Sequence, residues 1–218
     1  MSQLADALST AEQNAPKPAQ GLNAKTVLWI AIWSAIVFVL VSNELLLIAD
    51  YPLYHAYRTL LIADRYKLVP HATFGSLALL IGPLQFSTWL RRRYVKLHRV
   101  LGRIYVVSVG CASVMALTIS WGRPLMPATL TQVIAWITCT TLAFVTARNR
   151  QIAQHRAWMM RSYAVTLTFI TTRILSLWPA YWNLSDQAEV IVIIAFVVAS
   201  LLVVDVGLSW REITTARR

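Results

Sequence analysis

Long apolar runs alternate with short polar segments along this chain of 218 residues. A helix needs about 20 mostly apolar residues to cross the hydrocarbon core of a bilayer, and six runs come close to that length. The pattern therefore predicts an all-α fold, a polytopic membrane helical bundle that occupies residues 25–210. Its six predicted transmembrane helices cover residues 26–48, 71–90, 99–120, 129–147, 160–181 and 188–209.

Three segments outside these runs have a different character. Residues 1–24 are rich in Ala, Gln, Asn and Pro and lack the charged start and apolar centre of a cleavable signal. This composition predicts a disordered cytoplasmic tail. Residues 211–218 are predicted to form a short basic cytoplasmic tail. Residues 50–69 mix apolar and polar positions, which predicts an amphipathic helix on the outer surface. We expect it to end at Pro70, where the second span starts.

The composition agrees with a membrane location. Hydrophobic residues make up 57% of the chain and charged residues 13%, whereas about a quarter of a soluble domain is charged. The formal net charge of +11 lies in short clusters between the apolar runs. Such clusters predict contact with the lipid bilayer and not with nucleic acid.

The clusters also predict the orientation. Loops 91–98 and 148–156 are rich in Lys and Arg, and short loops of this kind stay in the cytoplasm. Both termini are then cytoplasmic. The sequence predicts a multi-pass protein of the bacterial inner membrane.

Two similar basic phrases stand at the predicted cytoplasmic starts of spans. They read "LHRVLGRIYV" from Leu97 and "QHRAWMMRSYAV" from Gln154. Orientation explains their arginines, but it does not explain a histidine in each phrase and a tyrosine about two turns deeper. The matching positions are His98, Arg99, Arg103 and Tyr105 in the first phrase and His155, Arg156, Arg161 and Tyr163 in the second.

The histidines carry the leading functional hypothesis, a b-type haem-binding or quinone-linked redox protein. Neutral imidazole is a good ligand of haem iron. His98 and His155 are predicted as the inner ligand pair and His71 as an outer ligand. Gly102 leaves a gap beside His98 that admits a helix or a flat ligand. The arginines that suit the haem propionates are Arg99, Arg103, Arg156 and Arg161, and Tyr105 completes the predicted cofactor site.

Polar residues inside the spans support an alternative, a transporter or binder of a small anionic or lipidic ligand. Arg173 is predicted to pair with Glu44, to bind an anion, or to reach the outer interface. Gln85 follows a Gly-Pro break and faces either a ligand or a neighbouring helix. Asp205 is predicted to pair with a cytoplasmic arginine.

A third interpretation is a non-catalytic accessory subunit of a membrane complex. No nucleophile elbow, metalloprotease pair or phosphate loop is found, so the sequence identifies no catalytic residue and leaves enzymatic activity open. Cys111 and Cys139 fall inside apolar runs, where they are interpreted as small core side chains.

Three phrases together resemble the bacterial family of predicted membrane proteins catalogued as domain of unknown function 2306. They are "HATFGSLALLIGPLQF", "LHRVLGRIYV" and "HRAWMMRSYAVTLTFITTRIL", and the resemblance covers roughly residues 70–180. It implies a multispan helical fold and supplies no activity. The layout is distantly similar to diheme cytochromes b, whose ligands lie within the spans, whereas His98 and His155 are at helix starts.

Overall fold

The structure is a computed structural model that describes residues 23–45, 64–176 and 178–215. In these ranges the chain is helical and has no β-strand, which confirms the predicted all-α fold. The predicted N-terminal tail lies outside the described residues, as does most of the predicted surface helix with its His55.

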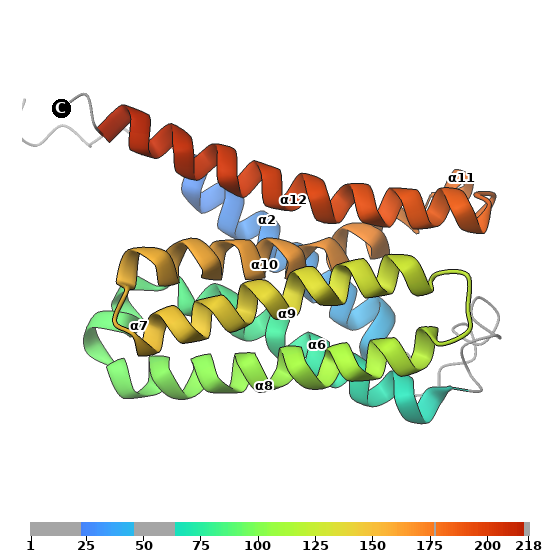
Figure 1. The fold of residues 1–218 in the computed structure, drawn as a ribbon, viewed down its shortest axis with the longest axis horizontal. Helices are drawn as coiled ribbons and strands as arrows, with labels where there is room; N and C mark the ends of the chain where they lie inside the picture. The colour runs from blue at the N-terminus through green and yellow to red at the C-terminus, as the bar shows by residue number, and fades with distance from the viewer. Residues whose placement is uncertain (1–22, 46–63, 177, 216–218) are drawn as a thin grey trace, which may run out of the picture. The chain divides into compact units, whose positions relative to one another are not determined.

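Figure 1 shows the described helices, and from α6 to α10 they follow one another with short connections. They are α2 (Ala24–Val39), the π-helix η1 (Leu40–Leu45), α6 (Arg65–Gln85), α7 (Thr88–Arg93), α8 (Val95–Ser120), α9 (Met126–Arg148), α10 (Ile152–Leu175), α11 (Pro179–Trp182) and α12 (Asp186–Thr215).

The chain divides into two compact units, Met1–Ser34 and Ala35–Arg218. The described part of the first unit begins with Asn23, whose Oδ1 accepts hydrogen bonds from the backbone N–H of Thr26 at 2.8 Å and from its hydroxyl at 2.9 Å. Such a side chain satisfies a backbone donor that has no partner within the helix, so α2 starts directly after it.

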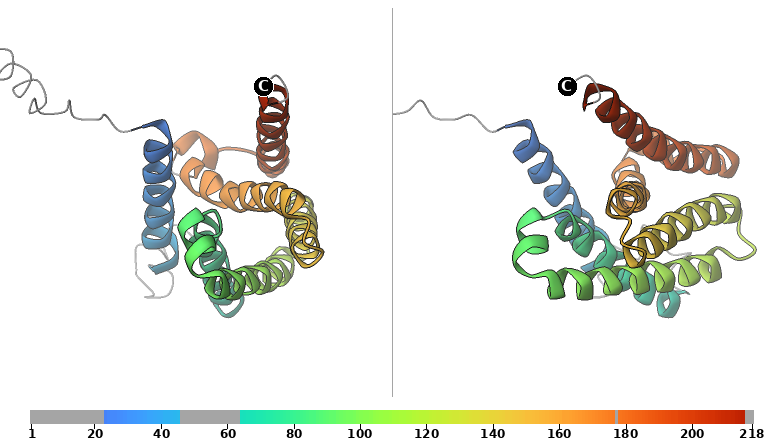
Figure 2. Two further views of the ribbon diagram at one scale, coloured as in Figure 1. Left: turned by 90° about the vertical axis from the view of Figure 1, so that its left-hand side faces the viewer. Right: turned by 60° about the vertical axis from the view of Figure 1, so that its left-hand side comes forward.

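Four helices of the second unit form a closed ring, α6, α8, α9 and α10, in which each contacts the next and α10 contacts α6 (Figure 2). Their directions alternate, so the connections gather at two ends. We call the end formed by residues 86–98 and 148–156 the basic end. The end formed by residue 64 and residues 120–126 is called the opposite end.

The core of the ring combines apolar residues from all four helices. Tyr105, Val109 and Val165 are fully buried, and burial of each such side chain stabilises a protein by about 1.5–3 kcal/mol in water. Ala78, Ala112 and Ala143 are among the other buried members, and small residues of this kind let membrane helices approach closely.

α12 packs against α9 and α10 but has little buried surface. Of its described side chains only Val197 is buried, whereas Ile191, Val203 and Val206 are exposed. This helix is the most apolar of those long enough to span a membrane. Its exposed face is therefore suited to lipid.

The predicted spans agree in part with the helices. Among the described residues, four helices are long and apolar enough to cross a membrane, α6, α8, α9 and α12. The first predicted span falls on α2 and η1, which are short individually, and the fifth falls on α10, whose buried residues include serine and threonines. The count of six and the cytoplasmic position of both termini stay predictions.

The expected start of the second span at Pro70 was wrong. α6 begins at Arg65, and Pro70 lies inside it. Proline removes one backbone hydrogen bond from a helix. At Pro70 this loss falls near the start of α6, beside exposed residues such as Tyr66.

Candidate functional site

A small cavity lies in the half of the ring near the opposite end. Its volume is about 30 Å³, which is room for about two water molecules because one needs about 10–15 Å³. The cavity is lined by Val39, His71, Ala72, Gly75, Ser76, Leu79, Trp136, Phe169 and Arg173. An imidazole and a guanidinium therefore meet at one space surrounded by apolar groups.

His71 is held in a fixed orientation. Its Nδ1 donates a hydrogen bond to the backbone carbonyl of Ala112 at 2.9 Å, because a carbonyl can only accept. The ring packs edge-on against Phe169 at 6.4 Å between centroids. With the proton fixed on Nδ1, the neutral ring offers Nε2 as an acceptor.

Arg173 reaches the same cavity from α10, one helical turn after Phe169. Phe169 packs against Trp136 at 5.0 Å between ring centroids. The predicted partner of Arg173, Glu44, has no described side chain. The predicted ligand-binding residues Arg173 and Gln85 do not share a site, since Gln85 does not line this cavity.

A hydrogen-bonded network crosses the centre of the ring. The hydroxyl of Tyr105 bonds to Ser162 and to Thr166, each at 2.9 Å. The indole N–H of Trp136 donates to Thr166 at 2.8 Å, and Thr140 bonds to Ser162 at 2.7 Å. These groups are buried. The network joins α8, α9 and α10 and separates the two ends.

A tight turn at the basic end places His155. Arg150 has a φ of 61°, a left-handed conformation that is uncommon outside glycine. The N–H groups of Arg150 and Gln151 bond to the carbonyls of Ala147 and Thr146, as in a Schellman motif. The chain turns back directly, and Nδ1 of His155 donates to the carbonyl of Ala143 at 2.8 Å.

His98 and His155 come together at this end, as the repeated phrases suggested. His98 lies on α8 and His155 on α10, which are not adjacent in the ring, and the two imidazoles interact electrostatically. Nδ1 of His98 is buried without a hydrogen-bond partner, and so is Nε2 of Gln85. A Cβ added to Gly102 would lie 3.3 Å from Oε1 of Gln85. The gap at Gly102 therefore admits the amide of Gln85 from α6.

The predicted propionate-binding arginines do not form one group. Arg99, Arg103 and Arg156 are exposed. Arg161 binds Asp205 of α12 instead, with Nη2 at 2.6 Å and Nε at 2.7 Å from the same carboxylate oxygen. Its guanidinium also stacks 4.6 Å from the ring centroid of Trp158. The prediction that Asp205 pairs with an arginine is confirmed.

Bulky side chains lie about one helical turn deeper than each of the two histidines. Met159 and Tyr163 are buried in the core, and Leu101 and Trp158 pack against it. A haem between His98 and His155 requires a flat slot, so these residues would have to move apart. The cavity beside His71 is also much smaller than a porphyrin. The described packing does not fit a haem.

Tyr163 explains why a glycine precedes Pro83. A Cβ on Gly82 would lie 2.1 Å from Cε2 of Tyr163, a distance that real atoms do not adopt. The Tyr163 hydroxyl donates to the carbonyl of Leu79 at 3.2 Å. Gly82 therefore lets α10 approach α6 through one aromatic ring.

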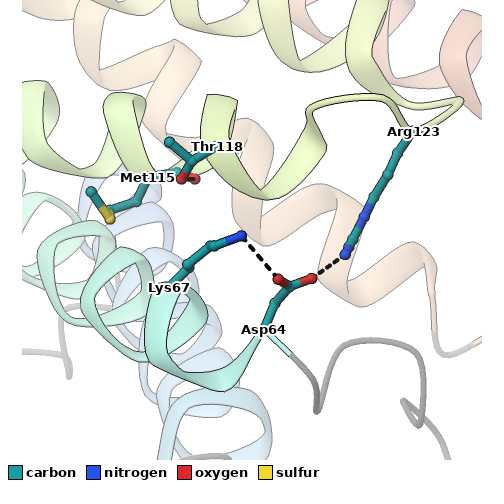
Figure 3. Close-up of polar contacts among 5 residues, drawn as sticks. All are labelled: Asp64, Lys67, Met115, Thr118 and Arg123. Atoms are coloured by element: carbon teal, nitrogen blue, oxygen red, sulfur yellow. Dashed lines mark hydrogen bonds and ion pairs between the residues drawn. The ribbon is translucent and has the colours of Figure 1, made fainter.

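The opposite end carries a charged cluster that the sequence did not suggest. Asp64, which precedes α6, forms ion pairs with Lys67 at 3.2 Å and with Arg123 in the turn between α8 and α9 (Figure 3). Lys67 and then Arg123 hold the pKa of the Asp64 carboxyl below its ordinary value of 3.8. The cluster fastens the start of α6 to this turn.

Sequence reasoning missed most of the buried network. Ser162 and Thr166 lie one turn apart, as do Trp136 and Thr140. This spacing on two apolar helices was a usable signal, because polar groups repeated every four residues share one helix face. The hydroxyl of Thr166 also donates within its own helix, to the carbonyl of Ser162.

Comparison with known proteins gives one result. Residues 68–206 match the family described as "Predicted membrane protein (DUF2306)". No curated protein and no solved structure matches the chain. The match covers more than half of the chain and includes every helix of the ring.

Proposed function

Since the chain belongs to the DUF2306 family of predicted membrane proteins, we propose that it binds a small oxyanion in the cavity lined by His71 and Arg173. The observation that carries the proposal is the meeting of these two side chains at one small space lined by α2, α6, α9 and α10. Arginine inside a membrane protein is costly and marks a functional site by default.

The two side chains select different parts of a ligand. The guanidinium of Arg173 donates hydrogen bonds and attracts negative charge. Because Nδ1 of His71 donates to Ala112, Nε2 of the neutral ring can only accept. The favoured ligand therefore has an anionic oxygen for Arg173 and a hydroxyl for His71. Hydrogen phosphate has both, and sulfate lacks the hydroxyl.

The size of the cavity restricts the ligand further. A volume of about 30 Å³ admits a small oxyanion or the headgroup of a larger molecule, with its remainder outside. The shared chemistry is the oxyanion, which is supplied either by a free anion or by an acidic lipid. Aromatic walls, Trp136 and Phe169, exclude water from one side and strengthen the electrostatic attraction.

The test compares two arginines in purified protein in a zwitterionic detergent. We expect inorganic phosphate to raise the Tm of the wild type more than sulfate does, by the equivalent of about 2.7 kcal/mol at a hundredfold excess over Kd. Arg173→Gln should lose this shift, and Arg103→Gln, which removes an exposed arginine, should keep it. Equal shifts in both variants, or no shift in the wild type with phosphate or phosphatidic acid, would contradict the proposal.

A second arm of the experiment separates binding from transport. Wild-type protein and Arg173→Gln are reconstituted in vesicles, and uptake of labelled phosphate is followed. Uptake that depends on Arg173 assigns transport to the cavity. A thermal shift without uptake assigns binding alone, of a free anion if phosphate is effective and of a lipid if only phosphatidic acid is.

A b-type haem or quinone-linked redox function is the second candidate. It is favoured by the proximity of His98 and His155 and by the bond from Nδ1 of His155 to Ala143, which leaves Nε2 available to a metal. The filled interior opposes the haem. Protein purified from cells supplied with haem precursor tests it: a Soret band that disappears in His155→Ala supports this candidate, and the lack of a band rejects haem.

A further inference from the structure

The basic end holds two buried polar atoms that have no hydrogen-bond partner, Nε2 of Gln85 and Nδ1 of His98. Gln85 is only 7% exposed. A buried polar group that loses its hydrogen bond costs about 1–3 kcal/mol. Two such groups in one place indicate that something else completes their hydrogen bonds.

Both groups lie close to Gly102. The amide of Gln85 lies over Gly102, since a Cβ there would be 3.3 Å from Oε1. His98 precedes Gly102 by four residues in α8 and so lies on the same face, one turn away. The absence of a side chain at Gly102 brings the amide from α6 next to the imidazole from α8.

The chemistry of the pair selects an acceptor oxygen. The amide nitrogen of Gln85 can only donate, and Nδ1 of His98 donates in one of its tautomers. Arg91 and Arg99 act electrostatically on this histidine, as does His155. The positive charge of Arg91 and Arg99 favours an electron-rich oxygen atom as the partner of the two donors.

We propose that Gln85 and His98 form a second binding site, which takes the oxygen of a carbonyl or carboxylate headgroup. Gln85 is the last residue of α6 and His98 the fourth of α8, so the site lies near a membrane surface. Such an oxygen comes from a lipid-soluble carbonyl compound of the quinone class or from a water-soluble carboxylate. This site is separate from the cavity at Arg173, and either can fail alone.

The chain offers a matched pair of glutamines for the test. Gln132 is part-buried and its Nε2 donates to Thr168 at 2.7 Å, so its amide already has a partner. Gln85→Leu and Gln132→Leu make the same chemical change at the two ends. A short-chain benzoquinone and benzoate serve as the lipid-soluble and water-soluble probes, and Kd is measured for the protein in detergent.

We expect one probe to bind the wild type and to bind Gln85→Leu at least about tenfold more weakly. Gln132→Leu should keep the wild-type affinity. His98→Phe should weaken binding as Gln85→Leu does. The infrared stretch of an isotope-labelled probe carbonyl should move to lower frequency in the wild type, because a hydrogen bond weakens the C=O bond, and should return in Gln85→Leu.

Which probe binds identifies the source of the oxygen. Equal affinity in wild type and Gln85→Leu overturns the site, because the amide then makes no contact with the ligand. Failure of both probes to bind the wild type also overturns it, and a buried water is then the partner of the two atoms. Loss of binding in Gln132→Leu to the same extent would assign the effect to general packing and reject the site.

Discussion

The two ends of the helical ring differ in the feature that indicates a ligand. At the opposite end, an arginine and an oriented histidine line a space of about 30 Å³. At the basic end, side chains fill the interior, yet the polar atoms of Gln85 and His98 lack partners. The opposite end has room for a ligand, and the basic end has buried polar atoms without a hydrogen-bond partner.

The largest effect that distinguishes the ends should come from two glycines of α6. In Gly82→Ala the new methyl collides with the Tyr163 ring at the basic end, and such overpacking costs about 1–3 kcal/mol. A Cβ on Gly75 meets nothing within 4 Å, so Gly75→Ala should gain up to about 1 kcal/mol from helix propensity.

Thermal unfolding in detergent measures both variants, with about 2–4 °C expected for each kcal/mol in a protein of this size. Gly75→Ala should also weaken phosphate binding, because Gly75 lines the cavity. A Gly82→Ala protein as stable as the wild type would show that Tyr163 does not rest on Gly82.

A smaller effect is expected at the network between the ends. Tyr105→Phe keeps the buried ring and removes a hydroxyl that bonds to Ser162 and Thr166, which should cost about 1–2 kcal/mol. Tyr66→Phe is the matched control, because Tyr66 is 92% exposed. If both variants unfold at the same temperature, the network does not hold the ends together.

The smallest effect is a pH dependence at the opposite end. The pKa of Asp64 is lowered in the folded protein, so its ion pairs stabilise the fold above the ordinary value of 3.8 and are lost as the pH falls through the lowered pKa. Asp64→Asn should therefore reduce Tm near neutral pH, and the difference from the wild type should shrink in acid. A difference that stays constant on acidification would exclude Asp64 as the titrating group.

Helix content was predictable because apolar runs of membrane length have few other solutions. The convergence of His98 and His155 was also suggested, since the two phrases occupy equivalent helix starts. The meeting of Arg173 and His71 at one cavity was not predictable, because their separation in sequence does not tell which residues of α6 and α10 face each other. Nor did periodicity reveal that Gln85 fills the gap at Gly102, which depends on how closely two helices approach.

The bond between Arg161 and Asp205 bears on how the protein is made. The two residues are 44 positions apart, and a ribosome completes the ring of four helices before it reaches Asp205. Until then the guanidinium has the Trp158 ring beside it but lacks its carboxylate. We expect a nascent chain that stops short of α12 to carry an uncompensated charge in the bilayer and to be short-lived. α12 would thus supply the carboxylate that compensates the charge of Arg161.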